Sequence, residues 1–149
     1  MKELVYREKT CTFFGHKNCP ASVQPELFQI LDHLISDEDI SVFYIGQQGN
    51  FDLFVYETLQ KLKQQYPHIQ PTVVLAYLST ASLAEPETTV FPEGLESVPP
   101  KYAIHHRNAW MLRNADIVVC YIEHDWGGAA KYVRSAQRKG KTIINLYHP

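Results

Sequence analysis

The sequence has few cysteines, and their spacing fits neither a disulfide framework nor a metal site. Its three cysteines are an odd set, and Cys11 and Cys120 fall within predicted strands. We interpret all three as reduced thiols. No stretch approaches the roughly 20 apolar residues of a membrane span, and the first residues lack the apolar core of a secretory signal. These absences predict a cytoplasmic protein with no membrane partner.

Runs of basic residues and the common nucleotide-loop motifs are also missing. The formal net charge is -2, and no run of lysine or arginine marks a surface that follows phosphates, so we expect no nucleic-acid partner. Neither a Walker A loop nor a GxGxxG motif is present, which argues against an ATPase or a nicotinamide-dependent dehydrogenase. We therefore expect no cofactor. A length of 149 residues suits one compact domain, 1–149.

Five apolar runs rich in β-branched and aromatic residues predict strands that are covered on both faces, at 11–14, 41–45, 72–78, 116–122 and 142–147. Four segments with helical periodicity alternate with them, at 27–35, 51–62, 102–114 and 128–138. This alternation predicts an α/β, Rossmann-like three-layer domain. Its sheet is expected to be five-stranded and mainly parallel, in the order 3-2-1-4-5.

Arg107 interrupts an apolar helical stripe. At 100° per residue it lies between Trp110 and Ala103 on one side and Met111 and Ile104 on the other. Burying an unpaired guanidinium costs several kcal/mol or more, so the charge needs an anionic ligand or a protein carboxylate. The alternatives are an internal ion pair or an arginine that extends past the helix edge to water.

Glycine and polar residues follow three of the predicted strands, in the segments GHKNCP, GQQGNFD and EHDWGGAAK. These loops meet at one edge of a parallel sheet, where helix N-termini bind anions and glycines allow close backbone approach. Ordinary turn chemistry and helix capping are the alternative interpretation. The predicted ligand-binding residues are Gly15, His16, Lys17, Gly46, Gly49, Asn50, Arg107, Asn108, Trp126, Gly127, Gly128 and Ala129.

The segment 79–101 has no regular periodicity and is much longer than an ordinary connection. We expect an ordered cover that can close over a ligand, with an idle surface insertion as the alternative. Phe91, Tyr102 and Trp126 can stack on a base or sugar, or they can pack this segment against the third helix.

The histidines do not form a metal motif. His105 and His106 are adjacent, so on a helix they point about 100° apart and cannot chelate one ion together. His16, His124 and His148 can converge only through the fold, and we predict no metal site. Cys19 precedes the first helix, whose N-terminus can lower the pKa of a thiol.

Several segments together resemble small bacterial proteins of the SLOG superfamily, which includes the LOG phosphoribohydrolases and the DNA-processing protein DprA. They are CTFFGHKNCP, GNFD, TVVLAYL, FPEGLESVP, the helix with RN-x-W-M, and the late WGGA. The resemblance covers nearly the whole chain. It implies a Rossmann-like fold, a site for a nucleotide or phosphorylated nucleoside, and a homodimer.

Two LOG motifs have counterparts here. The LOG segment MHERKAxM looks like IHHRNAWM, which places its catalytic arginine on Arg107. The segment PGGxGTxxE looks like WGGAAKYVR, with the glycine pair on Gly127 and Gly128 but Arg134 in the glutamate position. A carboxylate stabilises the positive charge that develops on ribose during N-glycosidic cleavage, and a cation there opposes it. The resemblance therefore implies binding more directly than hydrolysis.

We predict a binding module for a nucleotide or nucleotide-derived ligand that acts as a sensor, carrier or sequestering protein. The alternative is a nucleotide-processing enzyme, such as a LOG-like phosphoribohydrolase or an N-glycosyl-transferring relative. Its catalytic residues would be Arg107 and a relocated carboxylate, Glu123 or Asp52. A third hypothesis, DprA-like interaction with single-stranded DNA, lacks the expected basic groove.

Overall fold

The computed structural model describes residues 8–78 and 88–149. These residues form a parallel sheet of six strands in the order β4-β3-β2-β1-β5-β6. The strands are β1 (Lys9–Gly15), β2 (Ile40–Ile45), β3 (Gln70–Val74), β4 (Thr89–Val90), β5 (Ile117–Tyr121) and β6 (Thr142–Asn145).

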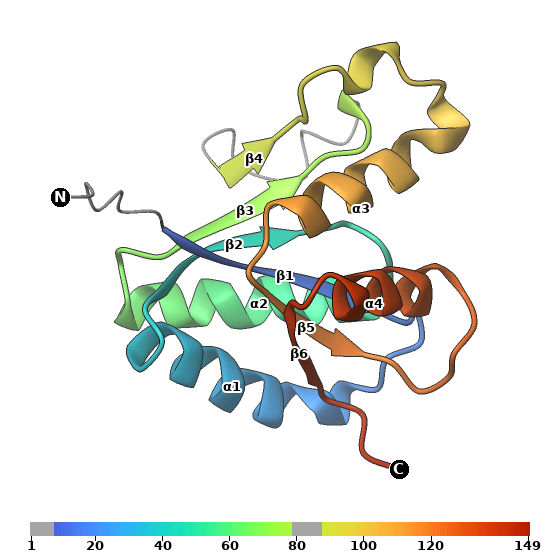
Figure 1. Ribbon diagram of the computed structural model, residues 1–149. Helices are drawn as coiled ribbons and strands as arrows, with labels where there is room; N and C mark the ends of the chain where they lie inside the picture. The colour runs from blue at the N-terminus through green and yellow to red at the C-terminus, as the bar shows by residue number, and fades with distance from the viewer. Residues whose placement is uncertain (1–7, 79–87) are drawn as a thin grey trace, which may run out of the picture.

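Helices cover both faces of the sheet (Figure 1). The helices α1 (Gln24–Ser36) and α2 (Gly49–Gln65) lie on one face, and α3 (Ala103–Arg113) and α4 (Gly128–Arg138) lie on the other. Pro25 stands in the first turn of α1, where its missing N–H costs no helical hydrogen bond. The predicted Rossmann-like three-layer architecture is confirmed.

Neighbouring residues of β1 face opposite cores, which explains its unbroken apolar sequence. Phe13 packs in the core beneath α1 and α2, and Phe14 packs in the core beneath α3 and α4. A strand that buries both faces shows no alternation of apolar and polar residues. Within the described ranges, no helix has the length and apolar character needed to span a bilayer.

The strand order is as predicted, but the predicted number of strands is wrong. The five expected strands correspond to β3-β2-β1-β5-β6 in space, and β4 is a sixth, paired through Val73 with Thr89 and Val74 with Val90. A strand of two residues is too short to give a periodic signal. The expected third strand also extends too far, because β3 ends at Val74.

The described part of the long segment, 88–101, is ordered by packing against β3 and α3. It contains two 3₁₀ turns, Leu95–Ser97 and Pro100–Tyr102. Buried Leu95 packs with Ala76 and Ala103 in a small third core. The rest of the predicted cover, 79–87, lies outside the described residues.

The three cysteines are buried and form no disulfide. Burial raises the pKa of the Cys120 thiol to about 12 and that of Cys19 to about 11. The predicted lowering of the Cys19 pKa by the first helix is therefore wrong, because desolvation dominates. Such a thiol stays protonated at neutral pH and is a poor nucleophile.

Candidate functional site

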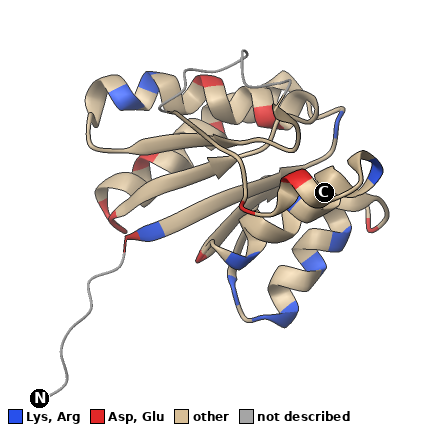
Figure 2. Ribbon diagram, turned by 90° about the horizontal axis from the view of Figure 1, so that it is seen from above, with Lys and Arg blue, Asp and Glu red and all other residues tan. Residues whose placement is uncertain are grey.

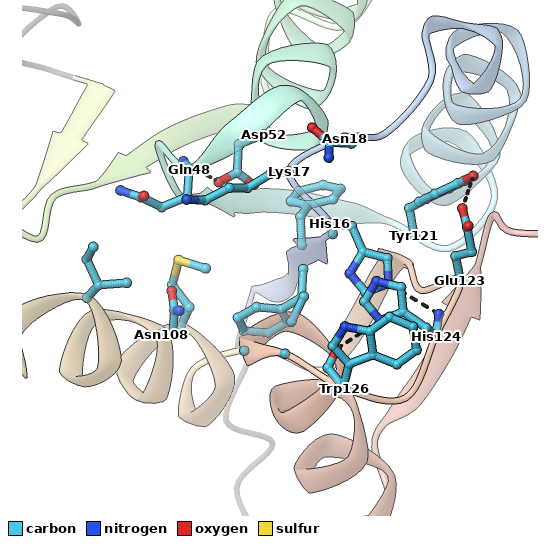
Figure 3. Close-up of a pocket in the computed structure, with 18 of the residues that line it drawn as sticks. His16, Lys17, Asn18, Gln48, Asp52, Asn108, Tyr121, Glu123, His124 and Trp126 are labelled. Atoms are coloured by element: carbon cyan, nitrogen blue, oxygen red, sulfur yellow. Dashed lines mark hydrogen bonds between the residues drawn. The ribbon is translucent and has the colours of Figure 1, made fainter.

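A cavity of about 640 Å³ lies at the carboxyl ends of β1 and β5 (Figure 3). These adjacent strands mark the point where the strand order reverses, which is where open α/β sheets bind ligands. We call this space the main cavity. The residues that line it are Phe13, Phe14, Gly15, His16, Lys17, Asn18, Gln48, Asp52, Ile104, Arg107, Asn108, Met111, Tyr121, Glu123, His124, Trp126, Gly127, Gly128 and Ala129.

Most of the predicted site residues meet in the main cavity. Those that line it are Gly15, His16, Lys17, Asp52, Arg107, Asn108, Glu123, Trp126, Gly127, Gly128 and Ala129. Sequence reasoning missed Phe13, Phe14, Asn18, Gln48, Ile104, Met111, Tyr121 and His124. Two of these, Ile104 and Met111, lie on the same helical face as Arg107, so the helical periodicity around Arg107 could have identified them as lining residues.

Gly46, Gly49 and Asn50, which were predicted to contribute to the same cradle, do not line the main cavity. Gly46 and Gly49 line a second hollow of about 270 Å³, and Asn50 lines neither space. Gly49 has φ 81°, and a β-carbon there would lie 2.7 Å from the Lys17 Cα. The Asn50 N–H donates to the Lys17 carbonyl at 3.1 Å. Gly49 and Asn50 hold the loop after β1 against α2.

The remaining glycines of the main cavity differ in what surrounds them. A β-carbon on Gly15 would lie 2.4 Å from the Phe51 ring, so this glycine is required by packing. At Gly127 (φ 96°) and Gly128 no atom lies within 4 Å of such a carbon. The first turn of α4 has neither an acidic residue nor a side-chain cap. Its free N–H groups and positive dipole end therefore adjoin open space.

Arg107 is 1% exposed and lines the main cavity. Its Nε donates to Asn108 Oδ1 at 2.8 Å, and its Nη1 donates to the Val74 carbonyl at 3.1 Å. Within the described residues no hydrogen bond engages Nη2, and no carboxylate forms an ion pair with the guanidinium. Burial lowers the pKa of Arg107, and Asp52 opposes this shift from a distance. The alternative of an arginine that extends to water is therefore wrong.

Asp52 is half-buried and lines both the main cavity and the second hollow. Its Oδ2 accepts the Gln48 N–H at 2.8 Å. Burial raises the pKa of this carboxyl to about 6, although the Gln48 hydrogen bond and the Arg107 charge act in the opposite direction. A carboxyl group with such a pKa can gain and lose a proton near neutral pH.

Three aromatic rings stack along one wall of the main cavity (Figure 3). The ring centroids of His16 and His124 are 3.7 Å apart, and those of His124 and Trp126 are 3.6 Å apart, with planes inclined by about 15°. The His124 N–H donates to His16 Nε2 at 3.4 Å, and His124 Nδ1 donates to the Trp126 carbonyl at 3.0 Å. Trp126 is 66% exposed, so much of its ring is free for a ligand.

The described part of the predicted cover does not reach this site. No residue of 88–101 lines the main cavity, because the segment packs on the ends of β3 and α3 instead. Phe91 belongs to the third core, and Tyr102 lies beneath the Lys101 ammonium, 5.1 Å from its ring centroid. Stacking of these two rings on a base or sugar, one of the two interpretations of the sequence, is therefore not supported, and the packing interpretation is correct for Phe91.

Arg134 and two of the histidines are also placed away from the main cavity. Arg134 is exposed and donates to the Asp125 carbonyl, so it puts no cation in the cavity. His105 hydrogen-bonds Tyr132, and His148 contacts Glu26 Oε1 at 2.7 Å. Among the described residues, no group of three or more His, Cys, Asp or Glu side chains is arranged to hold a metal ion.

Comparisons with known proteins identify the fold. The sequence matches no protein-family profile and no curated protein sequence. The structure is similar to an X-ray structure of DNA processing protein A (DprA) from Streptococcus pneumoniae, with a TM-score of 0.61 and 11% sequence identity. The match covers 93% of this chain and 50% of the DprA chain, so the chain corresponds to about half the length of that protein. The fold is a DprA-like Rossmann fold.

Proposed function

We propose that this protein binds a nucleotide or nucleotide-derived molecule in the main cavity. The observation that carries the proposal is the buried Arg107, which lines the cavity with Nη2 engaged by no described residue. A buried guanidinium of this kind is stabilised by an anion that accepts its remaining hydrogen bonds.

The α4 N-terminus supplies a second feature for an anionic group. Gly127 and Gly128 leave its free N–H groups uncovered on the cavity side. Phosphates bind at such helix ends because the N–H groups and the dipole act together. Exposed Lys17, on the loop after β1, adds a third positive group to the same cavity.

The size and aromatic wall of the cavity suit the rest of a nucleotide. Small-molecule sites commonly measure about 300–1,000 Å³, and the main cavity has about 640 Å³. Trp126 offers an exposed ring for stacking on a base, backed by His124 and His16. The phosphate thus lies near α4 and Arg107, and the base lies near Trp126.

The SLOG resemblance of the sequence agrees with this proposal. It relates Arg107 and the Gly127–Gly128 pair to a nucleotide-processing site, and the DprA-like fold is consistent with membership of that superfamily. Formation of a homodimer and the role of a sensor, carrier or sequestering protein remain predictions of the same proposal.

One observation favours the enzyme as a second candidate. Asp52 shares the main cavity with Arg107 and has a pKa near 6, so a carboxylate lies in the cavity although Arg134 replaces the LOG glutamate. In N-glycosidic hydrolysis the base leaves with the bonding electron pair and gains a proton, and water adds to the ribose carbon and loses a proton. Asp52 would stabilise the charge on the ribose, and Glu123 is the other carboxylate in the cavity.

Native mass spectrometry with a panel of nucleoside monophosphates and diphosphates tests both candidates. We expect a retained, unaltered ligand whose affinity falls at least tenfold in Lys17→Ala and in Arg107→Lys. Lys61→Ala, an exposed lysine of α2 outside the cavity, is the matched control. Release of free base with ribose phosphate would favour the enzyme. Equal affinity in wild type, Lys17→Ala and a folded Arg107→Lys would refute the assigned site.

A further inference from the structure

A third space, the α3–α4 cleft, lies between α3 and α4, and positive charge dominates its lining. Neither helix contains an aspartate or glutamate. The cleft has a volume of about 220 Å³ and shares no lining residue with the main cavity. Its lining residues are His105, Ala109, Leu112, Arg113, Lys131, Tyr132, Ser135, Arg138 and Lys139. Figure 2 shows Lys and Arg gathered on this side of the molecule, along α4 and the turn after it.

Sequence spacing explains why these residues face each other. On α4 and its C-cap the cleft is lined by Lys131, Ser135, Arg138 and Lys139, at i, i+4, i+7 and i+8, which is the spacing of one face of a helix. On α3 the residues from His105 to Arg113 that line the cleft repeat the same spacing. A hydrogen bond between His105 Nδ1 and the Tyr132 hydroxyl joins the two helices.

The four fixed cations of the cleft have no anionic partner in the described part of the chain. None of Arg113, Lys131, Arg138 and Lys139 forms an ion pair or a side-chain hydrogen bond there. The C-terminal ends of α3 and α4 together supply about one unit of negative charge. Four positive charges therefore leave a surplus of about +3. Lys131 lies in the first turn of α4, where the helix dipole is itself positive.

We propose that the α3–α4 cleft binds a small phosphate-class anion, such as inorganic pyrophosphate. Its 220 Å³ is below the roughly 300 Å³ at which ordinary small-molecule sites begin, so the cleft suits an anionic group without a base. Arg113 and Arg138 have the planar forks that match phosphate oxygens, and the two lysines add point charges. The anion would relieve the repulsion among the four cations.

Isothermal titration calorimetry with inorganic pyrophosphate at low salt tests this site. We expect the double variant Lys131→Gln/Arg138→Gln to bind at least tenfold more weakly than wild type. The control Lys9→Gln/Lys61→Gln removes the same charge from exposed positions outside the cleft and should bind as wild type does. Both double variants change exposed side chains, and circular dichroism checks their folding.

Two further arms distinguish the α3–α4 cleft from the main cavity and from a nucleic-acid surface. Lys17→Ala alters only the main cavity, so the part of pyrophosphate binding that Lys131→Gln/Arg138→Gln removes should be unchanged in this variant. Loss of binding in Lys17→Ala but not in Lys131→Gln/Arg138→Gln would assign the anion to the main cavity and overturn the proposal. A thymidine oligonucleotide that binds through the cleft while pyrophosphate does not would overturn the assignment to a small anion. Failure of nucleotide binding in the main cavity would leave this result unaffected.

Discussion

The imidazole rings of His16 and His124 stack face to face, with ring centroids 3.7 Å apart and planes inclined by 15°. His16 follows β1 and His124 follows β5, so the contact joins the two loops at the point where the strand order reverses. His16 Nε2 accepts a backbone N–H from His124, which requires that this nitrogen carry no proton. The wall of the main cavity therefore depends on a neutral His16.

Stability should fall with acid because of this contact. Burial, and secondarily the neighbouring His124, lower the pKa of His16 below its ordinary value of about 6.5, while Glu123 acts in the opposite direction. The native state thus binds fewer protons at His16 than the unfolded chain does. The stabilisation is present above about pH 6.5 and is lost as the pH falls through the lowered native pKa.

The variant His16→Phe isolates this effect because a phenyl ring can stack but does not titrate. Urea unfolding between pH 4 and pH 8 should show wild type losing stability relative to His16→Phe as the pH falls. Protonation elsewhere, including that of Asp52, is common to both proteins. Parallel pH profiles for the two proteins would show that the pKa of His16 is the same in the native and unfolded states, which would contradict the prediction.

Gly46→Ala should disturb the arrangement of Asp52 and Arg107. A β-carbon at this position would lie 2.9 Å from Asp52 Oδ2 and 3.3 Å from Arg107 Cζ. Overpacking of this kind costs about 1–3 kcal/mol of stability, and nucleotide affinity should fall with it. Gly128→Ala is the matched control, because no atom lies within 4 Å of its added carbon. Its free energy of unfolding should stay within about 0.5 kcal/mol of wild type in urea titrations.

The layers and strand order were predictable because strands buried on both faces leave long apolar runs. Arg107 could be predicted as a candidate site residue because a positive charge inside an apolar helical stripe needs an anionic partner. Gly46 and Gly49 line the second hollow and not the main cavity, and the sequence could not separate the two, since a glycine required by packing has the same sequence signal as one that approaches a ligand. The α3–α4 cleft could not be predicted from the sequence, because its cations are scattered along the chain and come together only when the two helices pack side by side.

The stacking of His16 on His124 could not be predicted from the sequence for a related reason. His16 and His124 are 108 residues apart, and the pairing of β1 with β5 brings them together. Neither their separation nor their neighbours in the chain predicts a ring contact. The raised pKa of Asp52 likewise depends on burial at the N-terminal end of α2, which a sequence position alone does not measure.

Trp126 should report nucleotide binding directly. The chain has two tryptophans, and Trp110 packs against Tyr44 with ring centroids 4.8 Å apart, so Trp110→Phe leaves Trp126 as the single exposed indole. We expect nucleotides to quench its fluorescence. Stacking on a base contributes about 1–3 kcal/mol, so Trp126→Ala should weaken binding about 5- to 150-fold, with partial recovery in Trp126→Phe. Ribose 5-phosphate lacks a base, and equal quenching by it would contradict base stacking.

Asp52→Asn should stabilise the protein at neutral pH. Its pKa is about 6 in the native state and about 3.8 in the unfolded chain, so the native state binds the extra proton. Ionisation therefore costs stability as the pH rises from about 4 to above 6. The asparagine carbonyl can still accept the Gln48 N–H, and its neutral side chain removes that cost.

The expected gain in unfolding free energy is about 1–3 kcal/mol at pH 8, and it should vanish near pH 4, where wild-type Asp52 is already protonated. Urea titrations at both pH values measure the difference. For an enzyme, Asp52→Asn should also abolish base release while nucleotide affinity is retained, and for a binding module only the stability should change. A variant that is less stable than wild type at pH 8 would mean that the Asp52 charge stabilises the buried Arg107 by more than its own desolvation costs.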